Sequence, residues 1–311
     1  MKRRGNSVPG FQKYSVADLH TEFPNDDACL DYIKEQRWPD GVAHCEKCNA
    51  DRKHYRVSGR TAYACDHCGN HIYPLAGTIF EKSTTRLTIW FHAMFLMGST
   101  RCGVSAKQIQ RETGVTYKTA WRMFKQIRTL MSEDISLEGS TIEMDETYMG
   151  GKRKNKHIGA RGTRGRTSGD DDTKTPVFGM VERGGRVIAK VTPDVRSATL
   201  YPIIHQYVMP SSIIYTDDFP VYDRLPSEAN GYVHHRIRHS ERVYVMGDVH
   251  TQTIEGFWSL VKRGIGGVYH NVSRKYLQTY LDEYAFRYNR RDAKIPMFVS
   301  LLEQVPLKAK E

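Results

Sequence analysis

Two stretches decide the fold of the larger part of the chain: Thr141-Ile-Glu-Met-Asp145 and Pro176-Val-Phe-Gly-Met-Val-Glu182. Both are short, carry apolar and β-branched residues, and lie between glycine-rich turns, which is typical of strands. Arg186-Val-Ile-Ala-Lys-Val-Thr192 repeats the pattern. We therefore predict a sheet that begins with three strands, and a domain boundary at residues 131–139, where helical patterns give way to strand patterns.

The rest of this domain mixes helices with strands. We expect a helix at about 197–208, a strand at Ser212-Ile-Ile-Tyr-Thr216, a weaker strand near 232–235, and two helices towards the C-terminus. The predicted order is β-β-β-α-β-α-β-α-α, which describes a mixed sheet flanked by helices over residues 139–295. A C-terminal tail is expected at 296–311.

The first 135 residues are expected to be helical around one cysteine-rich unit. Asn25 is a suitable N-cap for a short helix that ends at Trp38-Pro39-Asp40-Gly41, and residues 85–97 have helical apolar spacing. The expected parts are a helical segment at 1–40, the cysteine-rich unit at 41–80 and a helical domain at 81–135. The chain as a whole is therefore predicted to be a multidomain protein of the α+β or α/β class.

Four of the six cysteines form two pairs, Cys45-x-x-Cys48 and Cys65-x-x-Cys68, which are separated by 16 residues. Two such pairs can surround one tetrahedral Zn²⁺ ion. We predict a zinc ribbon with one structural Zn²⁺, because four thiolates leave no open coordination position. The alternative is a set of four unliganded buried cysteines, and His44, His67 and His71 are possible substitute ligands.

Residues 103–123 have the layout of a helix-turn-helix. Ser105 is placed to cap a first short helix, Gly114 lies at the turn, and Thr116 is placed to cap a second helix. An ordinary pair of antiparallel helices shares these features, so the charge of the chain and the neighbouring ribbon favour the DNA-binding interpretation. The side chains expected to face a DNA major groove are Thr116, Tyr117, Lys118 and Arg122.

Charge and hydrophobicity narrow the choice of partner. The chain has 46 Lys and Arg against 35 Asp and Glu, a net charge of +11, which favours a polyanion. Its longest nearly apolar stretch, Trp90–Met97, has eight residues including His92 and is too short to span a bilayer. Met1-Lys-Arg-Arg4 is not followed by an apolar run, so we expect no secretory signal. These features predict a cytoplasmic, nucleic-acid-binding protein with no membrane partner.

Three acids are placed for metal-dependent chemistry on phosphodiesters. Asp145 and Asp217 each end a strand-like run, so adjacent strands would bring both carboxylates to one edge, beside Glu255 on an expected helix. Two Mg²⁺ ions held by carboxylates can serve the attacking and the leaving oxygen. Asp218 and Glu146 compete for these roles. Strand alternation directs Glu146 to the face opposite Asp145, whereas the residues alone separate Asp217 from Asp218 only weakly.

Several motifs resemble a known family. They are Met144-Asp-Glu-Thr-Tyr-Met-Gly-Gly-Lys152, Thr175-Pro-Val-Phe-Gly-Met-Val-Glu-Arg-Gly-Gly185, Tyr215-Thr-Asp-Asp-Phe-Pro-Val-Tyr222, His250-Thr-Gln-Thr-Ile-Glu-Gly-Phe-Trp-Ser-Leu-Val-Lys-Arg-Gly264 and Phe286-Arg-Tyr-Asn-Arg-Arg291. With the cysteine pairs, they resemble the insertion-sequence transposases of the ISXO-like group, bacterial relatives of Merlin elements. The resemblance covers roughly residues 20–295.

This resemblance implies an RNase H-like catalytic domain whose acidic triad is Asp145, Asp217 and Glu255, and it selects Asp217 over Asp218. It implies a DDE transposase that binds the terminal inverted repeats of an insertion sequence and uses two Mg²⁺ or Mn²⁺ ions for DNA cleavage and strand transfer. The expected partners are double-stranded DNA, as repeats and as target, and further copies of the chain in a dimeric or larger synaptic complex. When bound to DNA, the protein would associate with the bacterial nucleoid.

Other basic residues are expected to contact DNA. A glycine-rich loop at 151–175 carries a one-sided run of positive charge that suits a phosphate clamp, although a solvated insertion would look similar; its first basic residues are Lys152, Arg153, Lys154 and Lys156. Lys262 and Arg263 lie two turns beyond Glu255 on the expected helix. His250 is expected either near the DNA and the metal ions or as a capping residue.

Two other functions remain open at this point. A zinc-ribbon transcription regulator would have the same DNA-binding parts and an inactive RNase H-like domain. A tyrosine-recombinase site would instead use His235, Arg236, His239 and Tyr244, but this grouping is unspecific and leaves Asp145 and Glu255 without a role.

Overall fold

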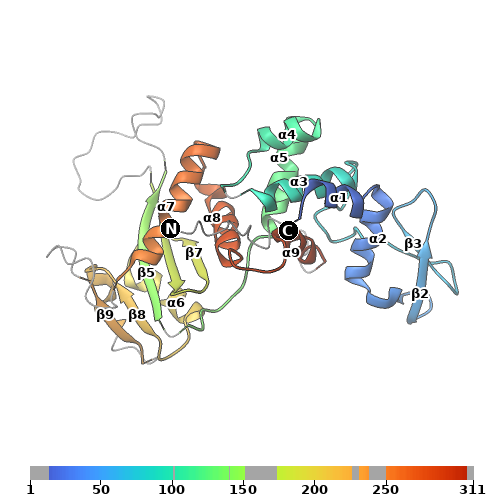
Figure 1. Ribbon diagram of the computed structural model, residues 1–311. Coiled ribbons are helices and arrows are strands. Elements are labelled where there is room, and N and C mark those ends of the chain that lie inside the picture. The colour runs from blue at the N-terminus through green and yellow to red at the C-terminus, as the bar shows by residue number, and fades with distance from the viewer. Residues whose placement is uncertain are drawn as a thin grey trace, which may run out of the picture. The chain divides into compact units, whose positions relative to one another are not determined.

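The computed structural model describes residues 14–100, 102–139, 141–150, 174–225, 231–237 and 250–306. The chain forms two compact units (Figure 1). The first unit contains the residues up to Met131 and those from Asp292 onwards, and the second is Ser132–Arg291. Within the described part of the chain, every helix is too short or too polar to cross a membrane.

The first unit is built around α3 (Leu87–Ser99), a helix with buried residues on most of its surface. It contacts α1 (Val16–Glu22), α2 (Asp26–Arg37) and α9 (Met297–Gln304). As predicted, Asn25 caps α2, accepting a hydrogen bond from the backbone N–H of Ala28 at 2.9 Å. The segment expected to be a tail thus contributes a helix, and a Cβ at Gly98 would lie 3.0 Å from the backbone nitrogen of Phe298. This close approach explains the glycine on α3.

Four short strands form the ribbon of the first unit. They are β1 (Val42–Cys45), β2 (Ala50–Arg56), β3 (Tyr63–Cys65) and β4 (His71–Ile72), paired antiparallel in chain order. Cys45 ends β1 and Cys65 ends β3, so the second cysteine of each pair lies in the turn that follows. This arrangement matches the zinc ribbon predicted from the cysteine spacing.

The helix pair predicted at residues 103–123 is confirmed. It consists of α4 (Ala106–Thr113) and α5 (Tyr117–Thr129), which are joined by a three-residue turn. The side chains of Ser105 and Thr116 cap the two helices, accepting bonds from the N–H of Gln108 at 3.1 Å and of Thr119 at 3.3 Å. Gly114 in the turn has φ +70°, a left-handed conformation that favours glycine.

A five-stranded sheet forms the centre of the second unit (Figure 1). Its strands are β5 (Thr141–Met149), β6 (Thr175–Glu182), β7 (Val187–Val191), β8 (Ile213–Thr216) and β9 (Val233–Arg236), in the spatial order β7-β6-β5-β8-β9. The first three pair antiparallel, whereas β8 is parallel to β5 and β9 is parallel to β8. This is the RNase H-like topology that the resemblance implied.

Helices cover both faces of the sheet. One face packs its apolar residues around α6 (Ser197–Tyr207), and the other packs against α7 (Gln252–Gly264) and α8 (Arg274–Asn289). The prediction of a helix between β8 and β9 is wrong for the described residues, where the chain forms no α-helix and includes the short 3-10 turn η5 (Pro220–Tyr222). After α7 the chain continues through the short π-helical segment η8 (Ile265–Tyr269).

Successive side chains along β5 point alternately towards α6 and towards α7 and α8. Ile142 and Met144 belong to the core beneath α6, whereas Met149 belongs to the core beneath α7 and α8. Because successive side chains point to opposite faces, Glu143 and Asp145 share the α7 face with Met149. The strand therefore presents two acids to the helix that carries Glu255.

Candidate active site

Asp145 lies on β5, and Asp217 directly follows β8, the parallel strand next to β5. The pairing of β5 with β8 aligns Glu143 with Tyr215, and continuing this register by two residues brings Asp145 beside Asp217. Burial, followed by the negative charge of Asp217 and a smaller contribution from Glu255, raises the pKa of Asp145 to about 6. The three acids predicted from the sequence are therefore close enough for their charges to interact.

The side chains of Asp217 and Glu255 are each oriented by a local hydrogen bond. Asp217 follows β8, and its carboxylate accepts a bond from the backbone N–H of Phe219 at 3.0 Å. Glu255 is exposed in the first turn of α7, where the hydroxyl of Thr251 donates to its Oε1 at 3.2 Å. One strand, the residue after a neighbouring strand and one helix thus supply one carboxylate each, close to the arrangement expected from the sequence.

Glu146, one of the two competing acids, points away from Asp145. It lies opposite Phe178 in the β5–β6 pair, on the face of α6, and its carboxylate accepts a hydrogen bond from the hydroxyl of Tyr222. Burial, then the charges of Asp217 and Asp145, raise the pKa of Glu146 to about 8. The prediction that Glu146 faces the opposite side of the sheet is confirmed. Asp217 and its neighbour Asp218 are both half-buried. The negative charge of Asp217 contributes to the raised pKa of both Asp145 and Glu146.

Gly179 gives α7 room to lie directly over the sheet beside Asp145. It is the cross-strand partner of Asp145, and a Cβ built on it would lie 2.4 Å from the ring of Trp258 and 3.0 Å from Ile254. Only glycine permits this approach without displacement of the helix. This role was not predicted from the sequence, although a glycine inside an apolar strand is a signal of close backbone approach.

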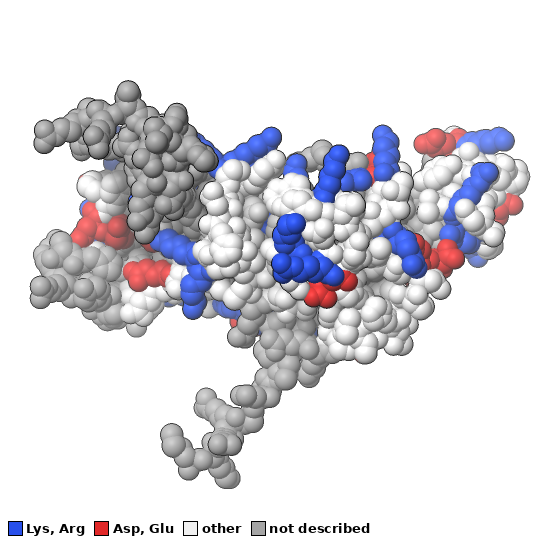
Figure 2. Space-filling model, turned by 90° about the horizontal axis from the view of Figure 1, so that it is seen from above, with Lys and Arg blue, Asp and Glu red and all other residues white. Residues whose placement is uncertain are grey.

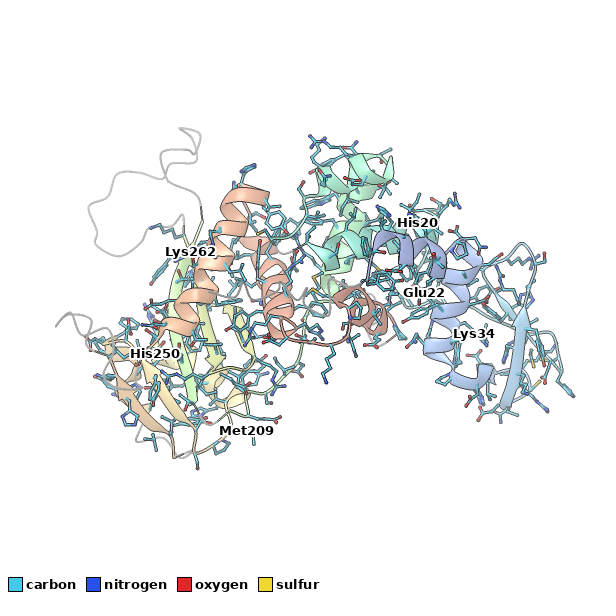
Figure 3. All side chains as sticks on the ribbon, in the orientation of Figure 1. His20, Glu22, Lys34, Met209, His250 and Lys262 are labelled. Carbon is cyan, nitrogen blue, oxygen red and sulfur yellow. The ribbon has the colours of Figure 1, made fainter. Side chains whose placement is uncertain are left out.

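Glu143 is a buried acid next to the site, and its role was also not predicted from the sequence. Its side chain is fully buried and accepts hydrogen bonds from the backbone N–H groups of Thr253 at 2.8 Å and Ile254 at 3.2 Å. The Nε of Arg183 donates to it at 2.9 Å. His250 precedes α7, with Nδ1 3.3 Å from Glu143 (Figure 3). The only sign of this role in the sequence was an acidic residue inside a run that has the pattern of a buried strand.

The four paired cysteines converge on one point in the ribbon. Their sulfur atoms all lie within 4.8 Å of one another, with Cys45 3.5 Å from Cys68 and Cys48 3.9 Å from Cys65. A tetrahedral zinc site with Zn–S bonds of about 2.3 Å requires S–S separations of roughly 3.8 Å. The residues present fit one Zn²⁺ ion. In the described part of the chain, no other group of three or more His, Cys, Asp or Glu side chains is gathered in this way.

Most of the basic and polar residues predicted to contact DNA are exposed. Thr116, Tyr117, Lys118 and Arg122 are all exposed on α5 and at its cap, and Figure 2 shows Lys and Arg side chains spread over the face of the protein seen from above. The ammonium of Lys107 lies 4.5 Å from the ring centre of Tyr117, and Arg122 donates to the carbonyl of Glu81 at 3.3 Å.

Two further basic residues, Lys262 and Arg263, are exposed on α7. Figure 3 labels Lys262 beside this helix. The remaining predicted contacts, Lys152, Arg153, Lys154 and Lys156, lie outside the described residues, as do His239 and Tyr244 of the recombinase alternative.

Comparison with known proteins identifies the family. The model of the ISXO2-like transposase domain matches residues 136–289, and that of the transposase zinc-ribbon domain matches residues 24–71. The chain is 31% identical over 280 residues to an uncharacterized protein in transposable element ISH50 of Halobacterium salinarum, covering 85% of this chain and 91% of that protein. An uncharacterized transposase-like protein of Haemophilus influenzae is 34% identical over 120 residues, which are 39% of this chain and 93% of the relative.

Among solved structures, a pre-cleavage Mos1 transpososome is similar over 66% of this chain and 75% of its own chain, with 12% identity and a TM-score of 0.27. The family matches cover the ribbon and nearly all of the second unit, and the ISH50 relative extends over both units. The chain therefore belongs to the family of ISXO2-like transposases.

Proposed function

We propose that this transposase cleaves DNA at the ends of its insertion sequence and joins them to target DNA through Asp145, Asp217 and Glu255. The observation that carries the proposal is the placement of Asp145 on β5 beside Asp217 after β8, with Glu255 in the first turn of α7, where the charges of Asp217 and Glu255, after burial, raise the pKa of Asp145. Such mutual repulsion is unfavourable in the metal-free protein and is relieved by a divalent cation. The site therefore has the charge that a cation requires.

The donor set suits Mg²⁺ or Mn²⁺. All three side chains offer oxygen ligands, which these ions prefer, and they come from separate elements of one unit. Asp145, Asp217 and Glu255 would hold two such ions, one serving the attacking and the other the leaving oxygen of the phosphodiester. Bound there, the ions would lower the pKa of water and neutralise charge on the phosphate.

The chemistry needs no covalent bond to the protein. Water attacks a phosphodiester at the end of the element, and the bond that breaks leaves a free 3′-hydroxyl. This hydroxyl then attacks a phosphodiester of the target, forming one phosphodiester bond as another breaks. The hydrogen bonds from Phe219 to Asp217 and from Thr251 to Glu255 orient the two carboxylates for these steps.

DNA recognition is assigned to the first unit. We infer that α5 enters the major groove of the terminal inverted repeat with Thr116, Tyr117, Lys118 and Arg122, because its outer side is exposed and basic. The ribbon would be held by one structural Zn²⁺ on Cys45, Cys48, Cys65 and Cys68. Lys262 and Arg263 would contact phosphates near Glu255. Pairing of two element ends calls for a dimer or larger oligomer, bound to the nucleoid.

The test is a nicking assay on a supercoiled plasmid that carries the element ends. Glu255→Gln keeps the shape of the side chain and removes its charge, so we expect Mg²⁺-dependent nicking to fall by at least 100-fold while DNA binding is retained. Glu138→Gln, an exposed acid of the same unit, is the control and should nick normally. Undiminished nicking by Glu255→Gln would disprove its role, and DNA binding by the unaltered protein without any nicking would favour a regulator with an inactive domain.

A further inference from the structure

A single guanidinium contacts three segments that adjoin the acidic triad. Arg183, which follows β6, donates from Nε to Glu143 on β5 at 2.9 Å and from Nη2 to the carbonyl of His250 before α7 at 3.0 Å. Its guanidinium carbon also lies 4.6 Å from the ring centre of Tyr215 on β8. The three contacts therefore connect β5, β8 and the start of α7 through one side chain.

Each contact lies close in sequence to one member of the triad. Glu143 lies two residues before Asp145 on the same face of β5, and Tyr215 lies two residues before Asp217. His250 lies five residues before Glu255. Two residues of a strand span only about 6.6–6.8 Å, so a shift at Glu143 or Tyr215 is transmitted to the neighbouring carboxylate with little loss.

Glu143 also fixes the start of α7. Thr251, the N-cap residue of this helix, makes no capping bond with its own side chain. The carboxylate of Glu143 takes this place by accepting bonds from the first-turn N–H groups of Thr253 and Ile254. A carboxylate at a helix N-terminus is favoured by the helix dipole and by the unpaired N–H groups of the first turn. The helix that carries Glu255 is thus capped by the strand that carries Asp145.

The bonding of Glu143 separates it from the metal-binding acids. Its Oε1 accepts from Arg183 and from the hydroxyl of Thr253 at 2.8 Å, and its Oε2 accepts the two backbone N–H groups. With both oxygens engaged and the side chain fully buried, it is a structural anion. Arginine suits its partner position because a planar guanidinium can donate in two directions and stack on a ring at once, which an ammonium cannot.

We propose that Arg183 and Glu143 are positioning residues that set the spacing of Asp145, Asp217 and Glu255 for metal binding. The inference rests on the proposed function of the triad. Residues that orient metal ligands typically change metal affinity or activity by 10–100-fold when they are replaced. A purely structural ion pair would lower the stability of the fold without altering metal affinity.

The experiment measures Mn²⁺ binding to the zinc-loaded chain by calorimetry, together with thermal unfolding and nicking. Arg183→Lys keeps the charge and removes the second donor direction and the flat face. Arg290→Lys is the matched control, because Arg290 also pairs with an acid, Glu133 at 2.8 Å, and stacks on a ring, that of Phe286 at 3.7 Å, elsewhere in the same unit. Glu143→Gln, which keeps the shape of the side chain, is the second test variant.

We expect the Kd for Mn²⁺ to rise about 10-fold or more in Arg183→Lys and Glu143→Gln, and to stay within about 2-fold in Arg290→Lys. The KM for DNA should stay constant while kcat falls. Unchanged Mn²⁺ affinity in a folded Arg183→Lys or Glu143→Gln protein would overturn the proposal, as would an equal loss in Arg290→Lys. Asp145→Asn distinguishes failure of the triad from failure of the positioning role. If this variant binds Mn²⁺ normally, the triad assignment is wrong. If it loses Mn²⁺ binding while Arg183→Lys and Glu143→Gln keep it, the positioning role is wrong.

Discussion

Gly179 lies directly opposite Asp145 in the antiparallel pair of β5 and β6, and the ring of Trp258 occupies the space where a side chain at Gly179 would be. Trp258 lies on α7, one turn after Glu255. The distance between the strand that carries Asp145 and the helix that carries Glu255 thus depends on the absence of a side chain at Gly179. This relationship explains why a glycine occupies the middle of an otherwise apolar strand.

Gly179→Ala is therefore expected to push α7 away from the sheet. Overpacking of a closed interface costs about 1–3 kcal/mol, so the free energy of unfolding should fall by that amount and nicking should fall with it. Urea unfolding and the plasmid assay measure the two effects. Gly256→Ala is the control, because a Cβ there meets nothing within 4 Å, and alanine in a helix should add up to about 1 kcal/mol. Equal stability of the two variants would contradict the packing argument.

When no divalent ions occupy the site, Asp145 and Glu146 should make the free energy of unfolding depend on pH. Burial and then neighbouring acids, Asp217 first, raise their pKa values to about 6 and about 8, whereas in the unfolded chain both titrate near pH 4. Between these values the folded state holds more protons. Their contribution to stability is therefore full below about pH 4 and is lost as the pH rises through 6 and 8.

The double variant Asp145→Asn with Glu146→Gln removes this contribution. Urea unfolding from pH 5 to 8.5 should show that it loses less stability than the unaltered chain, with no Mg²⁺ or Mn²⁺ added. His234, whose pKa burial lowers to about 4, acts in the opposite direction in both proteins and so cancels in the comparison. If the free energy of unfolding changed with pH in the same way in both proteins, the raised pKa values of the two carboxyl groups would be contradicted.

The ribbon should contain one zinc ion per chain. Cys68→Ser removes one of the four converging thiolates, so we expect loss of zinc and loss of the ribbon fold, because a unit this small depends on its metal. Metal analysis of the purified protein gives the stoichiometry. Cys102→Ser lies outside the cluster and should keep one zinc. A Cys68→Ser protein that retains zinc at the same stoichiometry would rule out the four-cysteine site.

The exposed start of α5 should contact DNA phosphates or bases. Lys118→Ala is expected to weaken binding to the terminal repeat and, if the contact is to a phosphate, to reduce the slope of log K against log salt by about 1. Fluorescence anisotropy over a range of salt concentrations measures both. Lys294→Ala removes an exposed lysine outside the helix pair and is the control. Identical binding curves for Lys118→Ala and the unaltered protein would remove Lys118 from the interface.

Much of the fold followed from local sequence patterns. Asn25, Ser105 and Thr116 cap their helices and Gly114 lies at the turn, as predicted, because a cap or a turn depends on only a few neighbouring residues. The cysteine spacing likewise predicted the sulfur cluster. The strands were predicted from their apolar runs, and the faces of β5 followed from alternation.

The parts that the sequence did not reveal depend on tertiary contacts. Gly179 matters only because α7 crosses above it, and Glu143 only because a helix N-terminus lies within its reach. The expected helix between β8 and β9 is replaced in the described residues by the turn at Pro220, whose fixed backbone suits a short turn. The expected tail forms α9 because α3 offers an apolar surface from another part of the chain.

The most direct test of the proposed triad is a substitution at Asp217, because Asp218 is its neighbour and could take its place. Cysteine binds Mg²⁺ poorly and accepts softer ions such as Mn²⁺ better, so a carboxylate that ligates the metal can be identified by exchange for a thiolate. In the plasmid assay, Asp217→Cys should lose nicking in Mg²⁺ and regain part of it in Mn²⁺, whereas Asp218→Cys should nick in Mg²⁺ like the unaltered protein. Normal nicking by Asp217→Cys in Mg²⁺, or the same change of metal preference in Asp218→Cys, would contradict the assigned triad.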